Sequence, residues 1–279
     1  MSGTQQALLA LTLALAAATA EERVGAAPAM VWPAPQTMKA SGARISLAPG
    51  FKIVAGDDQS CDPTDPTDPT TLSGCILKDA IYRYTAIAFG SKNVSGVARS
   101  GQLSEVKVML SDDSAALGLE TCENYSISIT PGDPEKEPWE PGSKAKGTIS
   151  SCTVYGAMHG LETFVQIIDG NGSSYSVPEI QILDGPRFHF RGLLVDSSRH
   201  YLPLSVLKAT VDALSYNKMN VLHWHIVDGD SFPFESKTFP SLTQHGAYDT
   251  KSHIYTHKEI AELVRYAQYR GVRVMPEFE

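Results

Sequence analysis

The alternation of strand and helix patterns after Pro186 limits the possible folds of this chain more than any other feature of its sequence. Buried-strand and amphipathic-helix patterns follow one another over 188–198, 204–214, 220–227, 260–267 and 272–278. The second helix follows a capping box formed by Thr256 and Glu259. Strands joined by helices form parallel sheets with right-handed crossovers. Because a closed barrel needs about eight such units and roughly 250 residues, we expect an incomplete barrel.

The preceding part of the chain is organised differently, because its helix and strand patterns do not alternate regularly. Helical spacing covers 76–88 and 157–168, whereas 106–110 and 125–129 alternate as strands do. This mixture predicts a small α+β domain over 27–185, followed by a second domain over 186–279.

The N-terminal segment over 1–20 is typical of a secretory signal peptide. An uncharged run rich in leucine and alanine ends in the cleavage pattern Ala18-Thr19-Ala20. This run is shorter than the roughly 20 residues that cross a bilayer, and no other segment is long enough, so no membrane span is predicted. Passage through a secretory pathway also fits the N-x-S/T sequons at Asn93, Asn124 and Asn171. The alternative is an ordinary N-terminal helix.

The cysteines of the chain all lie in its first 152 residues, at positions Cys61, Cys75, Cys122 and Cys152. Their spacing matches no C-x-x-C metal pattern, and in an exported chain they are expected to form disulfides. Four cysteines allow three pairings, of which Cys61 with Cys75 is favoured because it would close a loop of Asp-Pro-Thr repeats over 62–70. A second proline-rich segment, over 130–147, is also predicted to be a loop.

The charge balance excludes two classes of partner. The chain has 23 Lys+Arg and 31 Asp+Glu, a formal net charge of −8, and no block of consecutive basic residues. Nucleic acids and anionic membrane surfaces attract basic patches, so neither is an expected partner. The expected ligand is a small neutral molecule.

Polar side chains stand where the predicted parallel strands end, which is where such folds meet their ligands. These residues are Asp196, Arg199, Asp228, Glu277 and Glu279. An arginine offers five donors that fork onto vicinal sugar hydroxyls, and a carboxylate accepts from them. The alternative for Arg199 is a structural ion pair with Asp196 or Asp228.

Two further pairs on these strands allow more than one interpretation. His223 and His225 share a face of one strand, so they could hold a divalent metal, or they could be barrel-interior histidines with hydrogen-bonded nitrogens. Glu277 and Glu279 also share a face, and paired carboxylates serve as acid and base in glycoside hydrolysis. Their alternative is a structural role. Apolar residues over 232–234 and 239–240 would stack on a sugar or cover the barrel mouth.

Taken together, these motifs closely resemble the family 20 glycoside hydrolases, the β-N-acetylhexosaminidases. The quoted likeness includes Arg191-Gly-Leu-Leu-Val-Asp196, His223-Trp-His-Ile-Val-Asp228 and Arg270-Gly-Val-Arg-Val274. Upstream, 156–164 resembles the helix that closes the family's N-terminal domain, and 31–33 resembles its start.

The resemblance implies a zincin-like α+β domain that binds no metal, followed by a (β/α)8 TIM barrel. It implies removal of terminal β-linked N-acetylglucosamine or N-acetylgalactosamine from an oligosaccharide or glycoconjugate. Configuration would be retained, because the sugar's own acetamido oxygen attacks the anomeric carbon. No cofactor is implied. A homodimer and an extracellular, lysosomal or vacuolar location would fit the family.

By position, the resemblance assigns Arg199 and Asp228 to the hydroxyls of the terminal sugar. The family's catalytic Asp-Glu pair lies beyond the third strand, so no catalytic residue is assigned within 1–279, and this chain alone is expected to be inactive. Glu279 stands where the family usually has Asp, so it is only a possible site-lining residue. The competing hypotheses are a metal-dependent hydrolase using His223 and His225, and an inactive truncated isoform.

Overall fold

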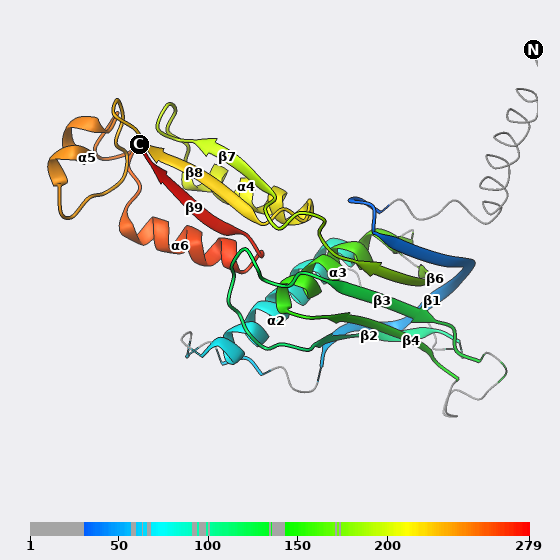
Figure 1. Ribbon diagram of the computed structural model, residues 1–279. Coiled ribbons are helices and arrows are strands. Elements are labelled where there is room, and N and C mark those ends of the chain that lie inside the picture. Colours follow the sequence, from blue (N-terminus) through cyan, green and yellow to red (C-terminus); the bar gives the residue numbers. More distant parts are fainter. Residues whose placement is uncertain are drawn as a thin grey trace, which may run out of the picture.

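The described part of the chain forms two β-sheets, one from each half of the sequence (Figure 1). A computed structural model describes residues 31–56, 60–62, 64, 65, 68–90, 94, 99, 101–133, 135, 143–170, 172 and 174–279. The predicted signal segment over 1–20 and the sequons at Asn93 and Asn171 lie outside these residues.

The N-terminal sheet has six strands in the order β1-β2-β4-β3-β6-β5. Their bounds are β1 (Thr37–Ala55), β2 (Leu103–Leu110), β3 (Tyr125–Thr130), β4 (Ala145–Ser151), β5 (Asp169–Gly170) and β6 (Tyr175–Asp184). The first half of β1 pairs antiparallel with β6, and its second half pairs parallel with β2. One long strand therefore connects the two sides of this sheet.

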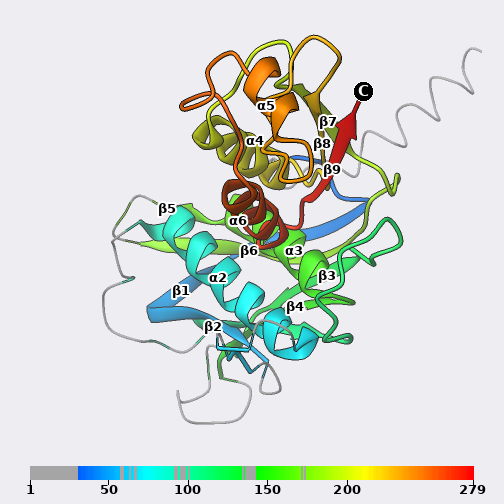
Figure 2. The same ribbon diagram turned by 90° about the vertical axis from the view of Figure 1, so that its left-hand side faces the viewer.

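Two helices, α2 (Pro69–Phe89) and α3 (Val154–Ile167), lie side by side against this sheet (Figure 2). They enclose a core that includes the fully buried Ile76, Leu103, Ile149, Leu161 and Phe164. Removing such apolar surface from water stabilises the fold by about 25 cal/mol per Å². The predicted mixture of helices and strands in this half is confirmed, although β1, β4, β5 and β6 were not predicted, and β4 begins inside the segment expected to be a loop over 130–147.

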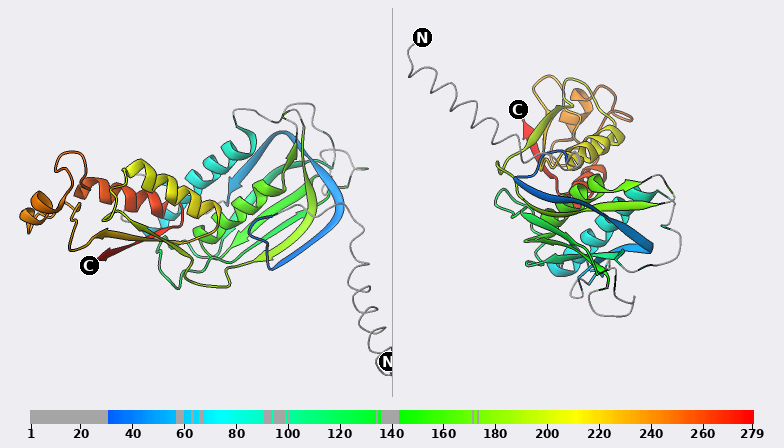
Figure 3. Two further views of the ribbon diagram at one scale, coloured as in Figure 1. Left: turned by 90° about the horizontal axis from the view of Figure 1, so that it is seen from above. Right: turned by 90° about the vertical axis from the view of Figure 1, so that its right-hand side faces the viewer.

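The C-terminal sheet contains β7 (Gly192–Asp196), β8 (Val221–Val227) and β9 (Arg273–Phe278), which run parallel in that order. Two helices, α4 (Leu204–Tyr216) and α6 (His257–Gln268), lie beside each other on one face (Figure 3). Leu222 and Trp224 pack against these helices, which leaves His223 and His225 on the opposite face.

The structure confirms the β-α-β-α-β prediction for this half and changes its details. The first strand begins only at Gly192 and not at residue 188. The capping box is present, because the Thr256 hydroxyl accepts from the Glu259 N–H while the Glu259 carboxylate accepts from the Thr256 N–H. A short helix, α5 (Pro240–Gly246), was not predicted. No helix within the described ranges is long and apolar enough to span a membrane.

Buried charges connect the two sheets. Glu123 is only 3% exposed; its Oε1 accepts from Arg191 Nη2 at 2.7 Å, and its Oε2 accepts from Asn220 Nδ2 at 3.1 Å. Nearby, Lys218 Nζ lies 3.2 Å from Asp184 Oδ2. Burial lowers the pKa of Lys218, while the Asp184 carboxylate opposes that shift. The C-terminal sheet is thus held against the N-terminal one by paired, desolvated charges.

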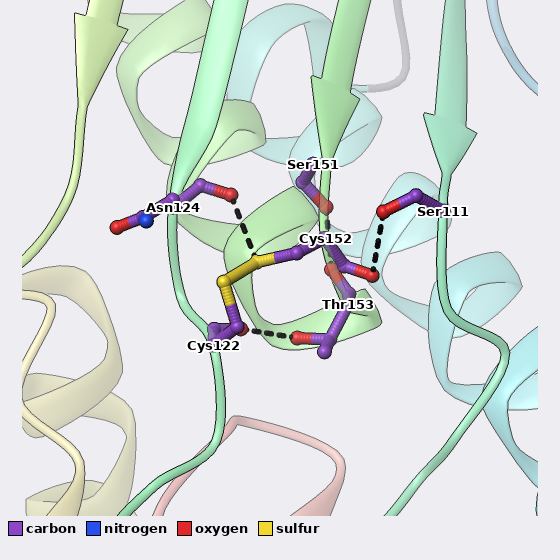
Figure 4. The surroundings of a disulfide bond; sticks show 6 residues. All are labelled: Ser111, Cys122, Asn124, Ser151, Cys152 and Thr153. Carbon is purple, nitrogen blue, oxygen red and sulfur yellow. Dashed lines mark hydrogen bonds between the residues drawn. A yellow bond between two sulfur atoms is a disulfide. The ribbon is translucent and has the colours of Figure 1, made fainter.

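Two disulfides stabilise the N-terminal half. Cys61 is bonded to Cys75, as predicted, and Cys122 is bonded to Cys152. The Thr153 hydroxyl donates to the Cys122 carbonyl at 2.6 Å, beside the second disulfide (Figure 4). The same figure shows the exposed Asn124 side chain pointing away from that disulfide.

Candidate functional site at the strand ends

The carboxyl ends of the parallel strands β7 and β8 bring Asp196, Arg199 and Asp228 together. Asp196 is the last residue of β7, and Asp228 directly follows β8. Arg199 lies in the loop that follows β7. Because neighbouring parallel strands end at the same edge of a sheet, these residues meet although they are far apart in the sequence.

Asp228 organises the loop that follows β8. Its Oδ1 accepts from the N–H groups of Asp230 and Ser231, both at 2.8 Å, and its own N–H donates to the Ser231 carbonyl at 3.0 Å. The Ser198 hydroxyl, followed by these backbone N–H groups, lowers the pKa of the Asp228 carboxyl. The other carboxylate oxygen of Asp228, Oδ2, lies 3.6 Å from Arg199 Nε.

The Arg199 guanidinium lies between two carboxylates yet stays open to solvent. Its Nη1 is 3.4 Å from Asp196 Oδ2, while its side chain is 68% exposed. The structural ion pairs considered from the sequence are therefore present, with both acids. They use few of the five guanidinium donors, so the same side chain still has donors to offer a hydroxylated ligand.

The two histidines of β8 each face carboxylates. His223 Nε2 lies 2.7 Å from Glu277 Oε2, and His225 Nδ1 lies 3.3 Å from Asp196 Oδ1. Glu279 Oε2 lies 3.6 Å from the Nε2 of His225. Across the described residues, no three His, Cys, Asp or Glu side chains are grouped to hold a metal ion.

The two glutamates face different histidines of β8. Glu277 is paired with His223, whereas Glu279 is 68% exposed and its carboxylate lies near His225. The geometry thus favours the structural interpretation of Glu277 and leaves Glu279 at the margin of the site.

Aromatic side chains surround the loop after β8, and one aromatic contact was not predicted. Phe234 packs edge-on against Phe278 with ring centroids 5.3 Å apart, whereas Phe239 is 63% exposed. Tyr248, which is 67% exposed, donates its hydroxyl to the Arg199 carbonyl at 3.1 Å. Because Tyr248 stands in a polar loop without periodicity, nothing in the sequence indicated this contact.

Comparisons with known proteins agree on one family. The chain matches "Glycosyl hydrolase family 20, catalytic domain" over residues 188–279 and "beta-acetyl hexosaminidase like" over residues 31–167. Beta-hexosaminidase subunit alpha of Rattus norvegicus is 36% identical over 261 residues, which are 89% of this chain and 45% of that protein. Beta-hexosaminidase 3 of Arabidopsis thaliana is 36% identical, over 89% of this chain and 44% of that protein.

Solved structures show the same relationship. The chitobiase of Flavobacterium johnsoniae superposes with a TM-score of 0.66 at 29% identity, over 88% of this chain and 34% of that one. The β-N-acetylhexosaminidase of Streptomyces coelicolor, at 22% identity and a TM-score of 0.61, shares the fold over 88% of this chain and 45% of that one. The chain spans less than half the length of these relatives.

Proposed function

Because this chain belongs to glycosyl hydrolase family 20, we propose that it supplies part of the sugar site of a β-hexosaminidase. Its substrate would be an oligosaccharide or glycoconjugate that ends in β-linked N-acetylglucosamine or N-acetylgalactosamine. The observation that carries the proposal is the Arg199 guanidinium, 68% exposed beside Asp196 and Asp228. Sugar hydroxyls accept from such a cation and donate to such a carboxylate.

In this proposal Arg199 and Asp228 act on the terminal sugar together. The lowered pKa of Asp228 keeps its carboxylate ionised, so it accepts hydroxyl protons while Arg199 donates to neighbouring oxygens. Such contacts fix the ring and orient the anomeric carbon. Glu279 would line the site. Retention through the substrate's acetamido group belongs to the same proposal, with no catalytic acid assigned among residues 1–279.

The architecture is part of the proposal as well. Residues 27–185 would be a zincin-like domain, and 186–279 would be the first β-α-β-α-β part of a TIM barrel. The separate sheets of the two halves support this division. The disulfides and the exposed Asn124 sequon support a secretory-pathway protein, and a homodimer is expected from the family.

Substitution of Arg199 tests the proposed sugar site. We expect Arg199→Ala to weaken transition-state binding by about 2–4 kcal/mol, which lowers kcat/KM roughly 30- to 1,000-fold. The measurement is hydrolysis of a chromogenic N-acetyl-β-glucosaminide by the protein produced from the whole gene. Arg265→Ala, an exposed arginine on α6, is the matched control and should change little. An unchanged kcat/KM for Arg199→Ala would remove Arg199 from the site.

A further inference from the structure

The buried histidine His225 lies beside Asp196, and one of its ring nitrogens makes no hydrogen bond within the part of the chain that the structure describes. The His225 side chain is 7% exposed and lies on the face of β8 opposite α4 and α6. Its Nε2 makes no hydrogen bond to any part of the chain that the structure describes, and Glu279 Oε2 is 3.6 Å away. Buried polar atoms without partners are uncommon. The other ring nitrogen of His225, Nδ1, lies closer to a carboxylate, at 3.3 Å from Asp196 Oδ1, and its side-chain contact helps to lower the pKa of Asp196.

The Asp196 carboxylate connects this histidine to Arg199. Its Oδ1 accepts from the Arg199 N–H at 3.0 Å, and its Oδ2 lies 3.4 Å from Arg199 Nη1. Burial alone would raise the pKa of Asp196, but the Arg199 N–H and the neighbouring His225 and Arg199 side chains lower it overall. Asp196 therefore remains an anion that contacts the imidazole and the guanidinium at the same time.

The backbone on both sides of the imidazole is fixed. The Ser197 N–H donates to the His225 carbonyl at 3.0 Å, and Trp224 Nε1 donates to the Ser197 hydroxyl at 2.8 Å. Trp224 is completely buried. These contacts tie the end of β7 to β8, so the distance between His225 and Asp196 does not depend on a mobile loop.

We propose that His225 is a positioning residue that orients Arg199 through Asp196. With its proton on Nδ1, the imidazole donates to the Asp196 carboxylate. This carboxylate in turn pairs with the Arg199 guanidinium, which would bind the sugar. An exposed arginine otherwise samples many rotamers, and restricting them places its donors before substrate arrives. The inference rests on the proposed function, because it concerns the same arginine.

Three variants of the protein from the whole gene test this role by hydrolysis of a chromogenic N-acetyl-β-glucosaminide. His225→Leu removes both nitrogens and should lower kcat/KM about tenfold or more, the size expected for a lost contact to a charged group. His225→Asn keeps an amide N–H near the position of Nδ1 and should restore most of the activity. His223→Leu is the matched control, because His223 lies on the same face but pairs with Glu277.

A double variant separates positioning from general damage to the fold. If His225 acts through Arg199, His225→Leu should have almost no further effect on kcat/KM in an Arg199→Ala background. Equal losses for His225→Leu and His223→Leu, or a full additional loss without Arg199, would overturn the positioning role. If His225→Leu does not fold, Asp196→Asn replaces it, with the same expected loss and the same dependence on Arg199.

The outcome for the unsubstituted protein distinguishes this inference from the proposed function. A protein without hexosaminidase activity would overturn both. An active protein that loses activity with Arg199→Ala but not with His225→Leu would overturn only the role of His225.

Discussion

The carboxylate of Glu123 is buried where the two sheets meet. Substitution of its partner Arg191 therefore tests whether buried charges hold the sheets together. Arg191 donates to Glu123 Oε1 from Nη2, and its other nitrogens donate to the carbonyls of Phe188 and Lys218 at 2.8 and 2.7 Å. The exchange Arg191→Met keeps an apolar chain of similar length and removes all of these donors. The Glu123 carboxylate, 3% exposed, would then lose its cation.

The expected cost follows from what remains around Glu123. Leaving a buried charge without its partner typically costs about 3–5 kcal/mol. Asn220 Nδ2 would still donate to Glu123 at 3.1 Å, so we expect the lower end, about 3 kcal/mol. The additional exchange Glu123→Gln removes the unpaired charge, and the double variant should therefore be more stable than Arg191→Met alone.

Urea unfolding followed by circular dichroism measures these differences in the free energy of unfolding. Lys208→Met is the matched control, because Lys208 pairs with Glu262, which is 52% exposed, and such surface pairs contribute about 0–1 kcal/mol. A loss for Arg191→Met no larger than that of the control would refute the argument that desolvated charges hold the sheets together.

Three further results are expected. Burial lowers the pKa of His159 to about 3, whereas the same side chain in the unfolded protein binds a proton below about pH 6.5. The free energy of unfolding should therefore fall by up to about 1.4 kcal/mol per pH unit as the pH is lowered from about 6.5 toward 3. Comparing the pH dependence of unfolding with that of His159→Gln measures this term, and identical slopes would contradict it. Replacing Cys122 and Cys152 by Ser should cost about 3–4 kcal/mol, measured by urea unfolding, for a sequence separation of 30. Mass spectrometry before and after deglycosylation should show a glycan on Asn124, and an unmodified peptide would exclude it.

The sequence predicted those parts of the fold that depend on local pattern. The Thr256–Glu259 capping box and the alternating elements after Pro186 are observed because their signals lie within a few neighbouring residues. The strand β1 was missed. Its residues contain Gly42, Gly50 and Pro49 and are largely exposed in its first half, so its extended conformation is set by pairing with distant strands and not by local preference.

The candidate site was predictable for a related reason. Arg199 and Asp228 follow the ends of the neighbouring parallel strands β7 and β8, and topology alone brings such positions together. The contact from Tyr248 and the position of His225 between Asp196 and Glu279 depend on side-chain geometry. Neither follows from residue spacing, which is why only the structure revealed them.

The span of β1 has a consequence for the synthesis of this protein. The Gln36 N–H, just before this strand, donates to Asp184, 148 residues further along the chain. At about 5–20 residues per second, a ribosome needs roughly 7–30 s to make that partner. During this time the first half of β1 presents unpaired backbone groups, which attract other strands. A nascent chain of this protein is therefore expected to need chaperone protection until β6 has emerged.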